Sequence, residues 1–300
     1  MDLQVRKDLL PTEEDVRFYR ENGYWLGPRI LDDEALEALR DRHARVVAGD
    51  YATGRPPLSH TPPPGEPLDR IVKIDNAYWA DPVVARLSTS PMLGAMAARL
   101  TGASGIRLWH DQLLLKPPDT GAQGNVGWHQ DYGYWQCAEP ADMLTAWVAL
   151  DDVTLENGCM QVVPGSHKWG LVPEGSFFVQ DLESLQAEME RRSGRRFELA
   201  QCILPAGAVS FHHCLTIHGS GPNVSGRPRR SIVVHMMPDG TRYRAGTPND
   251  NHSSVRLLSG RDGDPYAGPF FPLIYREGSG ETWTCWTAGE SVHPAVAAAK

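Results

Sequence analysis

The segment WHQDYGYWQ, residues 128–136, combines two metal-binding side chains with several aromatic ones. His129 and Asp131 stand two residues apart, so both side chains project from the same face of an extended chain. On the inner face of a β-structure, two such polar groups are costly unless they bind something. An imidazole and a carboxylate belong to the two-histidine, one-carboxylate set that holds iron(II) and leaves open positions.

The third ligand has to come from a distant strand, and His218 is the best candidate. Ser220 shares its face if this segment is extended. Arg229 follows eleven residues after His218 (229 − 218 = 11), beyond a Gly/Pro/Asn turn that leads into a neighbouring strand. A guanidinium beside a hydroxyl forms a clamp for a carboxylate. A small dicarboxylate cosubstrate that chelates the iron needs such a clamp at its far end.

Other histidines in the same region compete with His218 as the third ligand. His212 and His213 are adjacent, so at most one of them faces the metal in a strand, and neither has an arginine at the required distance. His110 and Asp111 are adjacent as well, and they cannot form a same-face pair.

Two other arginines compete with Arg229 as the partner of the carboxylate. Arg230 faces away if Arg229 faces in, and Arg227 lies in the turn before a proline. We interpret His167 and His235 as structural, with His235 close to the pocket.

A β-rich framework has to position these side chains, and the middle of the chain predicts one. Turn signals separate short strands expected at residues 106–116, 127–131, 144–151, 158–163, 208–211, 216–219 and 230–237. Several strands without intervening helices indicate an antiparallel sandwich or barrel.

The first hundred residues are predicted to be mainly helical. Helices are expected at residues 11–19, 32–48 and 90–100, and the acidic stretch 181–192 also reads as a helix with a solvated basic end. Residues 51–68 are rich in proline and glycine and therefore form a loop. We expect this loop and residues 239–256 to act as lids over the site.

Composition excludes several classes of protein. The formal charge of −8 (29 − 37) argues against nucleic-acid binding, because a phosphate-binding protein is usually basic. Five cysteines without a CxxC pair indicate neither a disulfide scaffold nor a zinc-thiolate site, and they favour a reducing cytoplasm. No apolar run is long enough for a signal peptide or a membrane span. The partners expected are a small-molecule substrate and, at most, a second copy of the chain.

The sequence resembles the phytanoyl-CoA dioxygenase family of iron(II)- and 2-oxoglutarate-dependent oxygenases. The resemblance rests on WHQD (128–131), AWVALDDVTLENGCMQVVPGSH (146–167) and HGSGPN with the following arginine (218–229), within a match over residues 12–238. It implies a mainly β fold with helical additions around a double-stranded β-helix, a jelly roll of the cupin type. A single domain is expected, with a helical part at about 1–104, a core at about 105–240 and a closing segment with a lid at about 241–300.

The resemblance also assigns roles to residues. It implies that His129, Asp131 and His218 bind iron and that Arg229 pairs with the distal carboxylate of 2-oxoglutarate. Four further residues are carried over to the cosubstrate pocket, namely Ser220, Trp147, Gln112 and Lys73. From the aromatic neighbourhood and the second loop, Tyr134, Trp135 and Arg242 are predicted to contact substrate.

The expected reaction consumes 2-oxoglutarate and O2 and releases succinate and carbon dioxide. The iron has room for three protein ligands, a bidentate 2-oxo acid and dioxygen, and hydroxylation of an unactivated C–H bond is the default outcome. The presence of Asp131 excludes halogenation, because halide takes the place of this carboxylate in related halogenases. Desaturation, epoxidation and ring closure use the same iron site and stay open.

Three alternatives remain beside a hydroxylase of a secondary metabolite or an amino-acid-like compound. One is an acyl-CoA hydroxylase of the same family, although no basic cluster plainly awaits the phosphates of CoA. The others are a metal-dependent hydrolase or isomerase that does not use 2-oxoglutarate, and a binding module that kept only the fold. Arg229 with Ser220 disfavours the hydrolase or isomerase, and the complete set of metal ligands together with Arg229 disfavours the binding module.

Overall fold

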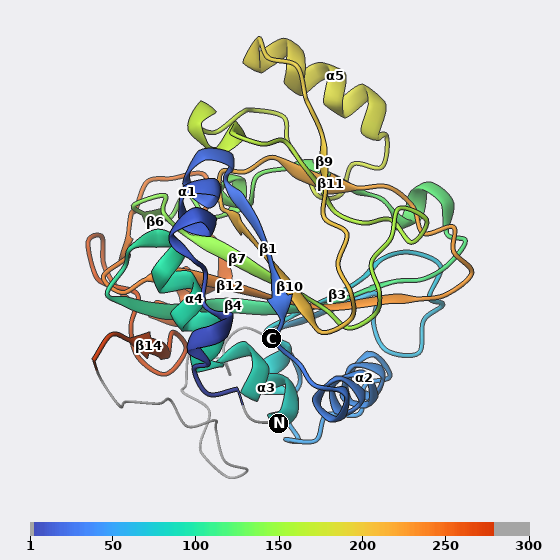
Figure 1. The fold of residues 1–300 in the computed structure, drawn as a ribbon, viewed down its shortest axis with the longest axis horizontal. Helices are drawn as coiled ribbons and strands as arrows, with labels where there is room; N and C mark the ends of the chain where they lie inside the picture. The colour runs from blue at the N-terminus through green and yellow to red at the C-terminus, as the bar shows by residue number, and fades with distance from the viewer. Residues whose placement is uncertain (1–2, 279–300) are drawn as a thin grey trace.

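Residues 3–278 are described by the computed structural model and form a β-rich body with helices on its outside (Figure 1). Cys285 and the last part of the expected closing segment, from residue 279, lie outside the described residues. Within residues 3–278, no helix is both long enough and apolar enough to cross a membrane.

Two antiparallel sheets make up most of this body. The larger has eight strands in the order β1-β10-β7-β12-β4-β3-β2, with β14 also paired to β4. The smaller has the order β5-β11-β8-β9, and β6 pairs with β13 separately. The bounds are β1 Tyr24–Arg29, β2 Ser59–Thr61, β3 Val72–Asp75, β4 Gly105–Lys116, β5 Val126–His129, β6 Ala138–Glu139, β7 Leu144–Ala149, β8 Gln161–Val162, β9 Ala200–Gln201, β10 Ala208–His213, β11 His218–Ser220, β12 Arg229–Pro238, β13 Arg242–Tyr243 and β14 Leu273–Arg276.

The seven predicted strands are all present, as β4, β5, β7, β8, β10, β11 and β12. The two main sheets enclose a pocket lined by residues from both of them. This arrangement is the expected double-stranded β-helix. The prediction for the first hundred residues was incomplete, because β1, β2 and β3 come from this part of the chain and extend both edges of the larger sheet.

The predicted helices occur at nearly the expected positions, and polar caps fix their starts. Thr12 and Asp15 form a capping box for α1, and Asp32 and Ser90 cap α2 and α4. Helix α3 was not predicted. The bounds are α1 Glu13–Asn22, α2 Asp33–Val47, α3 Pro82–Ser88, α4 Pro91–Thr101, α5 Leu182–Ser193 and α6 Ser253–Leu258, with 3-10 turns at η1 Lys7–Leu9, η2 Ala77–Trp79, η3 Gly121–Gly124, η4 Asp131–Tyr134 and η5 Ser166–Trp169.

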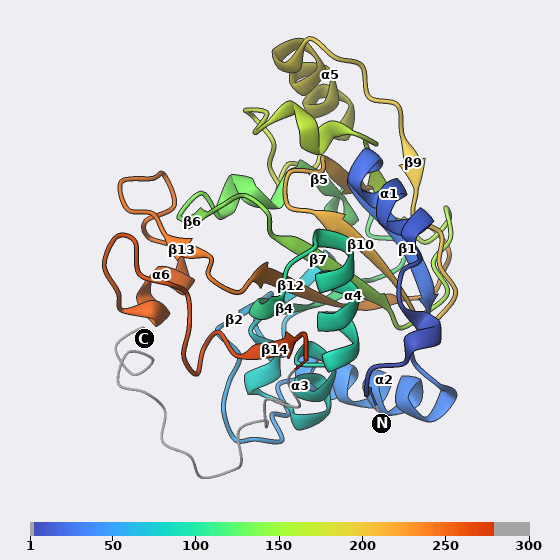
Figure 2. The ribbon, with the colours of Figure 1, turned by 60° about the vertical axis from the view of Figure 1, so that its left-hand side comes forward.

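The larger sheet separates a hydrophobic core from the pocket. Helices α3 and α4 pack on its outer face, whereas α5 lies beyond the smaller sheet at the opposite end of the molecule (Figure 2). Along β12, Ile232 and Val234 belong to the main hydrophobic core, and Val233 and His235 line the pocket. The alternation of a β-strand therefore sends every second residue of β12 toward the site.

Both segments expected to be lids border this pocket. Leu58 and Ser59 from the first segment and His252, Ser253 and Arg256 at the end of the second are among the lining residues. The segments are not loops throughout, because the first contains β2 and the second contains β13 and the start of α6. A lid motion stays a prediction.

Candidate active site

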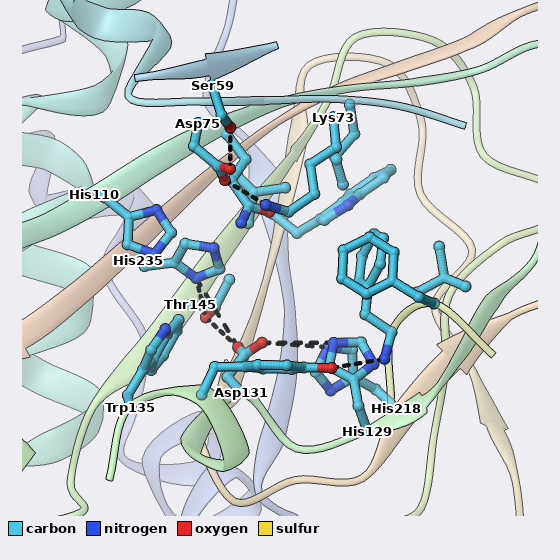
Figure 3. Close-up of a pocket in the computed structure, with 18 of the residues that line it drawn as sticks. Ser59, Lys73, Asp75, His110, His129, Asp131, Trp135, Thr145, His218 and His235 are labelled. Carbon is cyan, nitrogen blue, oxygen red and sulfur yellow. Dashed lines mark hydrogen bonds and ion pairs between the residues drawn. The ribbon is translucent and has the colours of Figure 1, made fainter. Parts of the chain in front are cut away.

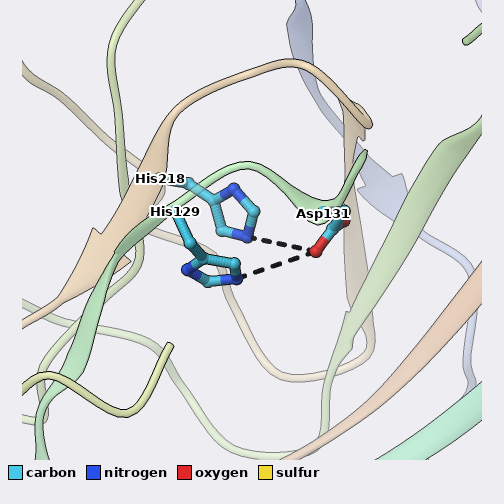
Figure 4. Close-up of side chains that lie close together, drawn as sticks. All are labelled: His129, Asp131 and His218. Atoms are coloured by element: carbon cyan, nitrogen blue, oxygen red, sulfur yellow. Dashed lines mark ion pairs between the residues drawn. The ribbon is translucent and has the colours of Figure 1, made fainter. Parts of the chain in front are cut away.

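Three buried side chains from two strands and a turn lie close together (Figure 4), and all three line one pocket. His129 ends β5, and His218 begins β11 directly opposite it in the strand pairing. The Nε2 atoms of His129 and His218 lie 3.7 and 3.8 Å from Asp131 Oδ1. One ligand atom from each residue falls within 4.8 Å of the others, which suits a single metal ion.

The local backbone differs from the prediction at Asp131. We expected the strand to continue through residue 131, but β5 ends at His129 and Asp131 opens the 3-10 turn η4. Gln130 between them keeps extended dihedral angles (φ −117°, ψ 131°), so His129 and Asp131 still project to the same side. The turn forms because the amide of Gly133 donates to the carbonyl of Gln130.

Both imidazoles are held with Nε2 directed at the centre of the group. The Nδ1 atoms of His129 and His218 lie 2.8 and 3.0 Å from the carbonyl oxygens of Gly127 and Thr216. Because a carbonyl only accepts, each Nδ1 carries the hydrogen and each Nε2 keeps its lone pair. Burial also lowers the pKa of His218 well below its usual range. Two neutral imidazole nitrogens and one carboxylate oxygen fit the ligand set of iron(II).

Asp131 is anchored by a second group of side chains through its other oxygen. Its Oδ2 accepts from Thr145 Oγ1 at 2.7 Å and lies 3.2 Å from His212 Nε2. Thr145 Oγ1 in turn lies 2.8 Å from His235 Nδ1. Burial alone would raise the pKa of Asp131, but the imidazoles around it hold it well below its usual range. The carboxylate is therefore ionised, with Oδ1 available to a metal.

Arg229 lies on the pocket wall in the predicted register. Its side chain is buried, its guanidinium carbon is 5.2 Å from the centre of the Trp147 ring, and Nη1 donates to the carbonyl of Gly158. Burial lowers the pKa of Arg229 to about 10, which leaves it charged at neutral pH. Arg230 faces away and pairs with Asp151 at 2.7 Å.

The other residues carried over to the cosubstrate pocket also line it. Ser220, Trp147 and Gln112 are on its wall. Lys73 is there as well, but its Nζ pairs with Asp75 Oδ1 at 2.5 Å. The charge of Lys73 is therefore partly neutralised within β3.

The pocket wall also carries polar residues that we had not assigned to the site, namely Ser59, Asp75, His110 and His235 (Figure 3). Ser59 and Asp75 lie on the side away from the iron ligands, whereas His235 Nδ1 is only 3.9 Å from Asp131 Oδ2. The rings of His110 and His235 are 4.5 Å apart, and Ser59 Oγ donates to Asp75. The whole cavity has a volume of about 400 Å³, which is enough for a small ligand beside a cosubstrate.

Two of the three residues predicted to contact substrate line the pocket, and one does not. Tyr134 and Trp135 are on its wall, and the Tyr134 hydroxyl accepts from the amide of Phe177 at 2.8 Å. Arg242 does not line the pocket, and its contact with substrate stays a prediction. Its side chain is exposed on β13 and donates to the carbonyl of Gly263, because pairing of β13 with β6 holds it away from the cavity. Arg256 from the same segment lines the pocket instead.

Among the residues around the site, Lys116 and Thr145 were not singled out from the sequence. His212 had been considered only as a rival metal ligand, and His235 as a structural residue close to the pocket. Arg229 and His235 are six residues apart in β12, so the alternation of a strand places both side chains on the same face. This spacing could have indicated that His235 belongs to the site. Thr145 and His212 become neighbours of Asp131 only through pairing of β7 with β10, which the sequence does not reveal.

The fold and the site define an iron(II)- and 2-oxoglutarate-dependent dioxygenase. The sequence pattern of the phytanoyl-CoA dioxygenase (PhyH) family matches residues 19–231, and the chain belongs to this family. It is 26% identical over 260 residues to phytanoyl-CoA dioxygenase, peroxisomal, of Bos taurus, a match that covers 82% of this chain and 75% of that protein. The expected family and fold are thereby confirmed.

Solved structures agree with the sequence comparison. The chain is similar to the non-heme alpha ketoglutarate dependent carbocyclase SnoK from nogalamycin biosynthesis, with 30% identity, a TM-score of 0.67 and coverage of 87% of this chain and 96% of that one. It is also similar to the epimerase SnoN in complex with Fe3+, alpha ketoglutarate and nogalamycin RO, with 26% identity, a TM-score of 0.69 and coverage of 87% and 98%. Iron and 2-oxoglutarate are therefore the cofactor and cosubstrate of this enzyme.

Proposed function

We propose that the enzyme hydroxylates, or otherwise oxidises, an unactivated C–H bond in a small polar molecule such as a secondary metabolite or an amino-acid-like compound. In this proposal His129, Asp131 and His218 bind the iron, and Arg229 with Ser220 binds the distal carboxylate of 2-oxoglutarate. The observation that carries it is that the three ligand side chains and the buried Arg229 line one cavity.

The residues of the chain prepare this reaction by orientation. Bound iron and 2-oxoglutarate supply the oxidising chemistry, in which one O2 and one 2-oxoglutarate yield the oxidised substrate, succinate and carbon dioxide. The backbone carbonyls of Gly127 and Thr216 fix the two imidazoles. Thr145 holds the Asp131 carboxylate, so the ligand atoms need little reorganisation to bind metal. The buried ring of Trp147 covers the Arg229 guanidinium and keeps water from the cosubstrate.

The hydrogen bonds of His235 favour a substrate with a donor group. Ionised Asp131 only accepts, so the Thr145 hydroxyl donates to it and the Thr145 oxygen accepts from His235 Nδ1. His235 Nε2 is then an acceptor, and it is buried without a partner among the described residues. A hydroxyl or amino group of the substrate would satisfy it, since an unpaired buried acceptor is costly.

Asp75 adds a second acceptor on the wall of the pocket, and its side chain is half-buried. Burial alone would raise the pKa of Asp75, but the Lys73 ammonium holds it below its usual range. Apolar walls from Trp135, Phe177 and Leu58 flank these acceptors. A compact molecule with hydroxyl or amino groups matches this combination better than the plain hydrocarbon chain of an acyl-CoA does.

Succinate release is the test of the proposed function. The iron-loaded protein is incubated in air with 2-oxoglutarate, ascorbate and either a fractionated extract of polar metabolites or a panel of acyl-CoA thioesters. We expect stimulation by polar fractions and none by the thioesters. Stimulation by a long-chain acyl-CoA alone would overturn the substrate class and favour the acyl-CoA hydroxylase. Product masses would separate hydroxylation from ring closure or desaturation.

We further propose a cytoplasmic enzyme that is a monomer or a homodimer. Cys137, Cys159, Cys202 and Cys214 are free and buried, which suits a reducing compartment. Size-exclusion chromatography with light scattering tests the oligomeric state, and a mass well above that of a dimer would contradict the proposal.

A further inference from the structure

Lys116 is a buried lysine with no acidic partner among the described residues. It ends β4, and its side chain is fully buried. The Nζ atom donates to Ser220 Oγ at 2.7 Å and to the carbonyl of Gly221. Both acceptors are neutral, and residues 3–278 contain no ion pair to this amine. Such a lysine is costly to bury, so its role has to be sought in what lies beside it.

Arg229 lies directly opposite Lys116 in the pairing of β12 with β4. Burial and the Arg229 guanidinium lower the pKa of Lys116 well below its usual range. Two basic groups thus share one buried region, with no carboxylate of the described chain between them. A bound carboxylate would relieve their repulsion. The distal carboxylate of 2-oxoglutarate, which we assign to Arg229, is such a group.

Lys116 reaches this carboxylate only through Ser220. Ser220 is on the wall of the pocket, whereas Lys116 lies behind it. An ammonium group has no acceptor, so its hydrogen bond uses a lone pair of Ser220 Oγ and leaves the hydroxyl hydrogen free. That hydrogen can then donate into the pocket beside Arg229.

We propose that Lys116 is a positioning residue that sets the Ser220 hydroxyl as a donor to the distal carboxylate and, with Arg229, selects a dicarboxylic 2-oxo acid over a monocarboxylic one. This inference rests on the proposed function, because it assumes that 2-oxoglutarate binds at Arg229. It also explains why a lysine occupies a position at which a hydrophobic residue would be cheaper to bury.

Anaerobic binding measurements by calorimetry test this inference without turnover. The probes are 2-oxoglutarate and 2-oxopentanoate, which has the same chain length but no distal carboxylate. The iron-loaded wild type, Lys116→Met and, as a matched control, the exposed Lys168→Met are compared. We expect Lys116→Met to reduce the preference for 2-oxoglutarate by about 10-fold or more, because hydrogen bonding to a charged group is lost, with little change for 2-oxopentanoate. Lys168→Met should keep the wild-type preference.

Thermal unfolding of the same proteins separates this role from a structural one. Without cosubstrate, Lys116→Met should melt no lower than the wild type, and 2-oxoglutarate should stabilise it less. A folded Lys116→Met protein with the wild-type preference would overturn the inference, as would a large loss of stability with that preference intact. If Lys116→Met fails to fold, Lys116→Gln serves in the same comparison. A wild type without any preference for 2-oxoglutarate would instead contradict the Arg229 assignment itself.

Discussion

Replacing Arg229 by methionine removes a buried charge while keeping most of the side-chain volume. Arg229 is 3% exposed, and no carboxylate of the described residues pairs with it, so the ligand would supply its charged partner. Losing such a charge-assisted pair costs about 2–5 kcal/mol. Since about 1.4 kcal/mol corresponds to a factor of ten, the 2-oxoglutarate requirement should rise by about 30-fold to about 4,000-fold.

Succinate release measured over a range of 2-oxoglutarate concentrations gives this requirement as a KM. Arg230→Met is the matched control, because its guanidinium forms hydrogen bonds of 2.9 and 2.7 Å with Asp151 on the other face of the strand. It should leave the KM within about threefold, as expected for a partly exposed ion pair outside the pocket. A steep rise in Arg230→Met and none in Arg229→Met would refute the strand register on which the cosubstrate site is built.

Two further substitutions test the hydroxyl of Thr145, which bonds the Asp131 carboxylate, and the buried carboxyl of Asp111. Thr145→Val removes the hydroxyl that links Asp131 to His235, and it should weaken iron(II) affinity by about 10- to 100-fold in competition with a chelator; an unchanged affinity would show that this hydroxyl does not orient the carboxylate. Burial raises the pKa of Asp111 from 3.8 to about 7. Between pH 3.8 and about pH 7, the Asp111 carboxyl is therefore protonated in the folded chain and ionised in the unfolded chain. Stability from this group is present below pH 3.8 and is lost as the pH rises to about 7, by up to about 4 kcal/mol. In urea unfolding, the stability of Asp111→Asn relative to the wild type should therefore increase from pH 4 to pH 7, and a constant difference would contradict the raised pKa.

The metal group could be predicted because its signals are local in the chain. His129 and Asp131 are two residues apart, and only one loop separates His218 from Arg229 in the sequence. We expected that loop to join neighbouring strands, but it crosses from β11 in the smaller sheet to β12 in the larger one. Alternation then predicted that Arg229 and not Arg230 faces the pocket, and the structure agrees. The end of β5 at His129 was not predicted, because it depends on a turn in which the amide of Tyr132 donates to the carbonyl of Cys214, a residue just after β10.

The surroundings of the site could not be predicted, because they arise from contacts between strands far apart in the chain. Lys116 and Ser220 are 104 residues apart, and His212 is 81 residues from Asp131. Neither pair has a sequence spacing that indicates contact. Arg242 lies outside the pocket for a similar reason. Its basic side chain and its segment suggested the pocket, but the pairing of β13 with β6 leaves it exposed.

The content of iron(II) bound under anaerobic conditions tests the central claim most directly. The wild type should bind about one iron per chain with a two-histidine, one-carboxylate site. His167→Ala is the matched control, since its ring contacts the carbonyl of Arg20 and lies outside the pocket. We predict that His167→Ala keeps this iron and that His129→Ala and His218→Ala both lose it. Retention of one iron per chain by a folded His218→Ala protein would contradict the assignment of the metal site.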